Sequence, residues 1–221
     1  MKRLALYLFV SVFCASLVAQ EKITEGVMSS TIKLSSSNAQ MNSQFAMIGD
    51  ISSVTYFKGN KTRTESANPM TGTSIVIIDN ATKKMLAYVN NAAMGKKYMQ
   101  DSIQPSEDEL KNVTVEKGAE TKTILGYTCQ QYFANLKEDG ATVNMELYTT
   151  DKLPAVSDKT AILGGKVKGY PLYLKMEAQN TVMDMIMTTE VTEIKQETVA
   201  DDKFNMTPPE GYTKTNNLNG I

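Results

Sequence analysis

The chain has 221 residues and a formal net charge of −1, and it contains no histidine and no tryptophan but 14 methionines. This length suits one domain with a sizeable core. The lack of histidine excludes Ser-His-Asp and Cys-His catalytic pairs and histidine-ligated zinc. Because the net charge is near zero and Lys and Arg form no long run, nucleic acid is not an expected partner.

The first 20 residues have the order of a secretory signal peptide. Lys2 and Arg3 precede an apolar stretch over 4–13, and mostly small residues follow. The apolar stretch is shorter than the ~20 residues needed to span a bilayer. We therefore predict an exported chain, periplasmic or outer-membrane associated, that is soluble after cleavage. In the alternative interpretation Cys14 carries a lipid, although the bulky Phe13 precedes it.

Removal of this segment would leave 21 Lys and Arg against 24 Asp and Glu, a net charge of −3. It would also leave Cys129 as the only cysteine, so an intramolecular disulfide is excluded. Cys129 lies in a strand-like run with no basic cluster beside it to lower its pKa. A buried small hydrophobe is the favoured interpretation, and a reactive or intermolecular thiol is the alternative.

Alternating apolar and polar residues recur along the mature chain, with turn signals about every ten residues. They predict about ten strands, mostly joined as antiparallel hairpins. The predicted strands cover 28–34, 54–57 with 62–65, 74–78 with 85–89, 124–136 with 143–149, and 172–178 with 182–194. The predicted short helices cover 37–48, one or two turns after a capping box at Ser106, 157–163 and 201–204. We expect one domain over 21–212 and a frayed tail over 213–221.

Methionine is concentrated on one predicted face of the strands. When charged residues are placed outward, half of the twelve inward positions are methionine. Three interpretations remain open: an irregular core, a flexible surface for an apolar ligand, and a Cu(I) site at Met183, Met185 and Met187. The twelve positions are Met28, Ile32, Leu34, Val143, Met145, Leu147, Leu172, Leu174, Met176, Met183, Met185 and Met187.

Motifs for catalysis are weak in this sequence. The acidic run after Ser106 is explained by helix capping, and Gly164-Gly165 lacks the spacing of a phosphate loop. We therefore expect a protein that is not an enzyme and that uses no cofactor and no metal.

Several short motifs, in their order along the chain, carry a resemblance to a known family. The chain resembles an uncharacterised family of exported bacterial proteins known only as a domain of unknown function. That family is similar in turn to the periplasmic outer-membrane lipoprotein carrier (LolA-like) proteins. The resemblance covers most of 26–212, and its motifs lie at 58–65, 75–85, 123–129, 169–172 and 204–212.

The resemblance implies a mainly β (α+β) fold: a single strongly curved antiparallel sheet, an unclosed half-barrel with short helices on its concave side. In such carriers the concavity holds acyl chains, so the inward positions above would line it. A helical stripe of Met41, Phe45 and Ile48 would act as a lid. The predicted function is non-catalytic binding of a lipid or lipoprotein acyl group in the periplasm. The alternative is an envelope interaction or sensor module, with an envelope protein as partner and no small-molecule ligand.

Overall fold

The computed structural model describes residues 21–138, 140–154, 156–179 and 184–218. The predicted signal peptide, Cys14 and Met183 lie outside these residues. None of the helices in the described ranges has the length and apolar content that crossing a membrane requires.

The first half of the chain contains β1 (Glu25–Ser35), α1 (Ala39–Ile48), β2 (Ile51–Lys58), β3 (Lys61–Asn68), β4 (Gly72–Asp79), β5 (Lys84–Asn91), β6 (Gly95–Ser102) and α2 (Glu107–Lys111). The second half contains β7 (Val113–Ile124), β8 (Tyr127–Glu138), β9 (Ala141–Thr150), α3 (Asp158–Ala161), β10 (Tyr170–Gln179), β11 (Asp184–Lys195), the 3₁₀ turn η1 (Asp201–Phe204) and β12 (Thr213–Lys214).

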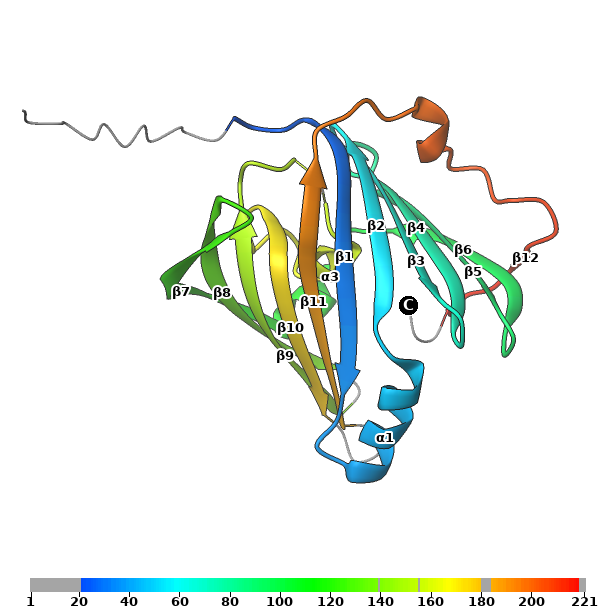
Figure 1. Ribbon diagram of the computed structural model, residues 1–221, viewed down its shortest axis with the longest axis horizontal. Helices are drawn as coiled ribbons and strands as arrows, with labels where there is room; N and C mark the ends of the chain where they lie inside the picture. The colour runs from blue at the N-terminus through cyan, green and yellow to red at the C-terminus, as the bar shows by residue number, and fades with distance from the viewer. Residues whose placement is uncertain (1–20, 139, 155, 180–183, 219–221) are drawn as a thin grey trace, which may run out of the picture.

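All twelve strands form one curved sheet in the order β12-β6-β5-β4-β3-β2-β1-β11-β10-β9-β8-β7 (Figure 1). Neighbouring strands are antiparallel except for the short parallel pair of β12 and β6. The predicted fold class, a mainly β unclosed half-barrel, is therefore confirmed. β1 and β11 come from opposite ends of the chain, and their pairing joins the two halves of the sheet.

The sequence patterns miss β7, which lies at one edge of the sheet, and β6, whose outer side pairs only with the two-residue strand β12. Nearly every residue of β6 and β7 is at least partly exposed, and Lys, Glu and Gln interrupt the apolar alternation. Such charged side chains are typical of sheet edges, where they discourage pairing with other chains. An edge strand therefore looks like a polar loop in the sequence.

The predicted strand over 124–136 is wrong at its start. β7 ends at Ile124, and a two-residue turn at Leu125 and Gly126 leads into β8. Both turn residues have positive φ, 50° for Leu125 and 83° for Gly126. Two such residues in succession match the twist of a tight hairpin, and glycine adopts this conformation without strain.

The helix predictions hold, and in α1 and α2 a capping side chain determines where the helix begins. The Asn38 side chain accepts a hydrogen bond from the Met41 amide at 3.0 Å and begins α1. In α2 the predicted capping box is present: Ser106 Oγ accepts from the Glu109 amide, and the Glu109 carboxylate accepts from the Ser106 amide. These contacts satisfy amides that the helix itself leaves free.

The C-terminal segment packs against the sheet, so the predicted frayed tail is wrong for residues 213–218. The segment runs past η1 to the β6 edge, where Thr213 and Lys214 pair with β6 (Figure 1). On the way, Met206 and Tyr212 pack on the buried cluster of Ile77, Leu86 and Tyr88. Leu218 then packs on the opposite face of β4 and β5. The apolar contacts of Met206, Tyr212 and Leu218 hold this segment on the sheet, although residues 213–217 are polar.

Candidate functional site on the concave face

The strand register places the predicted inward residues of four strands, β1, β9, β10 and β11, on one face, which is called the concave face below. Leu147 pairs with Leu174, which pairs with Thr189, and Thr189 pairs with Ile32. Because paired residues point to the same side of a sheet, these four side chains share one face. A neighbouring row on the same face consists of Met145, Met176, Met187 and Leu34.

Burial divides the predicted site into two groups. The fully packed group is Met28, Ile32, Met145, Leu147, Leu172 and Leu174. The partly exposed group is Leu34, Val143, Met176, Met185 and Met187. Both groups belong to the same half of the sheet, and most of the partly exposed residues lie toward the end of β1 from which α1 begins.

The predicted lid helix does not cover this face. α1 lies beyond the ends of β1 and β2 (Figure 1), and none of its residues is buried. Met41, Phe45 and Ile48 are each partly exposed. Ser36 and Ser37 bond to Asp184, which ties the entry of α1 to the start of β11.

A different segment lies over the concave face: residues 151–154 and 156–169, between β9 and β10, which are called the plug below. Its Leu163 is completely buried against a cluster that includes Leu147 and Leu174. The α3 turn of the plug lies behind β10 and β11 in the view of Figure 1. The plug occupies the position in which the resemblance placed a lid.

Polar contacts also hold the plug. The Lys166 ammonium group donates to the carbonyl oxygens of Leu110 and Val113, at 3.0 and 2.7 Å. Thr149 Oγ1 donates to the Lys168 carbonyl oxygen at 2.6 Å. Two glycines with positive φ, Gly164 and Gly165, end the helical turn, as their sequence predicts.

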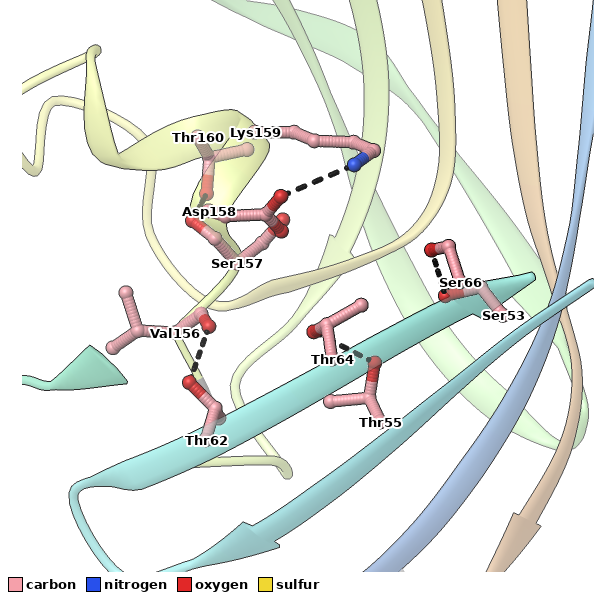
Figure 2. Close-up of polar contacts among 10 residues, drawn as sticks. All are labelled: Ser53, Thr55, Thr62, Thr64, Ser66, Val156, Ser157, Asp158, Lys159 and Thr160. Carbon is pink, nitrogen blue, oxygen red and sulfur yellow. Dashed lines mark hydrogen bonds and ion pairs between the residues drawn. The ribbon is translucent and has the colours of Figure 1, made fainter. Parts of the chain in front are cut away.

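The floor of the concave face beside the plug is lined with hydroxyl groups, none of which is among the predicted site residues (Figure 2). Thr55 and Thr64 are joined through their Oγ1 atoms at 3.1 Å, and Ser66 Oγ donates to Ser53 Oγ at 3.1 Å. Thr62 Oγ1 donates to the carbonyl oxygen of Val156 in the plug at 3.0 Å. The alternation of Ser and Thr along β2 and β3 is the signal that could have revealed this face.

A small pocket remains between the hydroxyl floor and the start of α3. Asp158 and Lys159 form an ion pair over it at 3.2 Å, and their side chains are less than one fifth exposed. Tyr170 also lines it, and burial raises the pKa of the Tyr170 phenol well above its usual range. The volume is about 20 Å³, which fits about one water molecule and is far too small for an acyl chain.

Thr189 also indicates that this pocket suits one water molecule rather than an acyl chain. Its Oγ1 is the one buried side-chain N or O atom, among the residues that the structure describes, with no hydrogen-bond partner. A water in the pocket, which Thr189 also lines, would satisfy it. The pocket can therefore bond a small polar group and fix the plug to the sheet.

A larger hollow of about 480 Å³ lies elsewhere, where α2 meets the β8–β9 turn. It is wide open to solvent, and the carboxylates that line it are already engaged. Lys111 pairs with Asp108 at 2.7 Å, and the Glu109 carboxylate caps its own helix. Within the described ranges, no group of three or more His, Cys, Asp or Glu residues is arranged to hold a metal ion.

Cys129 is a free thiol that is completely buried in a cluster with Met28, Phe57 and Tyr148. The predicted buried small hydrophobe is confirmed. Burial raises the pKa of the Cys129 thiol to about 11, above its usual value near 9.0. A raised thiol pKa favours folding while the thiol is neutral, so this contribution is present below pH 9.0 and is lost as the pH rises toward 11.

We expect native protein to react slowly with a disulfide reagent at pH 8, and chain unfolded in urea to react at the rate of a free thiol. The unfolding free-energy difference between the wild type and Cys129→Ala should shrink between pH 9 and 11. Native protein that reacts as fast as the unfolded chain would contradict the burial of this thiol.

Comparison with known proteins gives a family but no activity. No curated protein matches the chain. Among solved structures, the chain is similar to PNGF-II in two crystal forms, C2 and P21, at 17% and 16% identity with TM-scores of 0.47 and 0.46. Each match covers 86% of this chain and 31% of that one, so the chain spans about a third of PNGF-II.

A further similar structure is described as an outer membrane lipoprotein-sorting protein domain from Vibrio parahaemolyticus. The identity is 9% and the TM-score 0.25, with 84% of this chain and 91% of that chain covered. Residues 25–162, more than half of the chain, match a domain of unknown function, DUF4412. The predicted family is thereby confirmed: the chain belongs to the DUF4412 family.

Proposed function

We propose that this protein is a non-catalytic, exported binding protein that holds an acyl chain of a lipid or lipoprotein between the apolar half of its concave face and the plug. The observation that carries the proposal is the composition of this half. β9, β10 and β11 present a continuous apolar face whose partly exposed members include Met176, Met185 and Met187. Flexible thioether side chains can repack around apolar chains of different shape.

The plug would have to move for such a ligand to enter, because the space beneath it is only about 20 Å³. Its attachment favours such a movement. α3 is a single short turn with no buried residue, and much of the plug is held by individual polar contacts such as that of Thr62 with Val156. Water could replace these contacts at little cost when the plug swings away.

The test is binding of palmitate to the mature chain, measured by native mass spectrometry. We expect one palmitate per chain, and about tenfold weaker binding for the double variant Met176→Gln/Met187→Gln, which keeps the side-chain size but adds polar amides to the apolar face. Leu125→Gln is the matched control, since Leu125 is exposed at the far end of β7 and should leave binding unchanged.

One observation favours a second candidate, an envelope interaction module without a small-molecule ligand: the protein's own side chains fill most of the concave face. Chain isolated from the periplasm without ligand, and unable to take up palmitate, would reject the acyl-binding proposal. Crosslinking in cells to one protein partner would then support the second candidate.

A further inference from the structure

In the half of the sheet formed by β1 to β6, the end from which α1 begins carries little charge. Three stretches at this end, 34–49, 66–73 and 90–95, contain no Asp, Glu, Lys or Arg. At the chain's overall charged fraction of 21%, about six of these 30 residues would be charged. The turns at the opposite end of the same strands do carry charges, namely Lys58, Lys61, Asp79, Lys83 and Lys84.

The fold brings the three uncharged stretches together. β1, β3 and β5 all run toward this end, so α1, the β3–β4 turn and the β5–β6 turn lie there (Figure 1). The Asn68 side-chain amide donates to the Ile48 carbonyl oxygen at 2.9 Å and fixes the β3–β4 turn to the last turn of α1. This group of three segments is called the uncharged end below.

Two methionines project from the uncharged end into solvent. Met47 on α1 is 66% exposed and Met70 in the β3–β4 turn is 62% exposed, the largest values for big apolar side chains in the described parts of the chain. The backbone of Met70 is held, because its amide donates to Asn68 Oδ1 at 2.8 Å. Exposed apolar groups on a charge-free surface are typical of a site that contacts another apolar phase.

We infer that the uncharged end docks on the surface of a lipid bilayer with neutral headgroups. α1 adds apolar side chains without any charge to this end, since Met41, Phe45 and Met47 lie among Ser, Asn and Gln. The inference deepens the proposed function, on which it rests, because the bilayer would supply or receive the acyl chain.

The charges around the uncharged end favour neutral over anionic lipid. Lys33 and Asp50 flank α1 and offset each other, and Asp184 is engaged by Ser36 and Ser37. The two lysines that begin β6 are engaged by the C-terminal segment: Lys97 donates to Thr213 Oγ1 at 2.9 Å, and Lys96 lies over the Tyr212 ring. Since the chain as a whole is slightly acidic, an anionic surface would repel it. Docking should therefore depend on apolar insertion and change little with salt.

The first test is flotation of the mature chain with phosphatidylcholine vesicles. We expect wild-type protein to float with the vesicles at both low and high salt, and Met47→Asp/Met70→Asp to bind about tenfold less. Leu125→Asp, also an exposed apolar residue but at the opposite end, should bind like the wild type. Wild-type protein that stays in the soluble fraction, or that binds only anionic vesicles at low salt, would overturn the inference.

The chain contains no tryptophan, so one introduced tryptophan is a clean reporter. Met47→Trp emission should shift to the blue on phosphatidylcholine vesicles, and Leu125→Trp emission should not. A blue shift that appears when only the protein concentration is raised, without vesicles, would instead show self-association and overturn the inference.

Palmitate uptake, measured separately, should be normal in Met47→Asp/Met70→Asp. If the wild type takes up palmitate but does not bind vesicles, only the docking inference is refuted. If the wild type does not take up palmitate, the proposed function is refuted.

Discussion

Leu163→Ala is expected to lower the free energy of unfolding by about 2–5 kcal/mol and to loosen the plug from the sheet. Leu163 is the side chain through which the plug packs most deeply, since it is completely buried among residues of β7, β8, β9 and β10. Truncation removes its apolar contacts and leaves a cavity that the paired strands cannot collapse to fill. The rest of the plug is held by polar contacts and by Leu153, which is buried in the cluster of Met28 and Tyr148.

Two measurements follow from this expectation. Urea unfolding should report the loss of stability, and an apolar dye such as ANS should bind more strongly to the folded variant, because the concave face becomes accessible. If the plug gates acyl entry, palmitate should also associate faster with Leu163→Ala than with the wild type.

The neighbouring residue provides the matched control. Ile162 lies on the same segment and has the same size, but it is 37% exposed, so Ile162→Ala should change stability by less than about 1 kcal/mol. Equal losses for the two variants, with no added dye binding for Leu163→Ala, would contradict the position of the plug.

The strands that are easiest to predict are those with one buried face. In β10 the charged Lys175 and Glu177 alternate with Leu174 and Met176, and the register confirms the side on which each lies. The edge strands β6 and β7 have no such contrast because their surroundings are mostly water. β6 pairs with β5, and β7 with β8, as neighbours in the sequence, so these strands lack an apolar contrast rather than a nearby partner.

The candidate site could be predicted only in part, for a related reason. Apolar alternation identifies the side of the sheet that is buried, but not the segment that buries it. Leu163 and Leu218 cover the concave face from two polar, irregular segments, and their role depends on where the chain returns. The Ser and Thr residues of β2 and β3 do alternate in the sequence, but the alternation alone does not show that they are buried, since alternating hydroxyl residues normally predict a solvated face.

Gly26→Ala is expected to lower the free energy of unfolding by about 3 kcal/mol or more, because no side chain fits at this position. A Cβ atom on Gly26 would lie 2.2 Å from the Lys195 carbonyl oxygen and 3.1 Å from the Phe57 ring. The first neighbour is backbone, so a side-chain rotation cannot relieve the overlap. β1 would have to separate from β11 at the seam that joins the two halves of the sheet.

Chemical unfolding measures the loss, and hydrogen exchange locates it: amides of β1 and β11 should lose protection before those of β4 and β5. Ser29→Ala is the control on the same strand, because its side chain is only partly buried and alanine fits there, so its effect should stay within about 0.5 kcal/mol. Gly26→Ala protein with wild-type stability would mean that β1 and β11 do not approach this closely in solution. The two halves of the half-barrel would then be joined more loosely than their register requires.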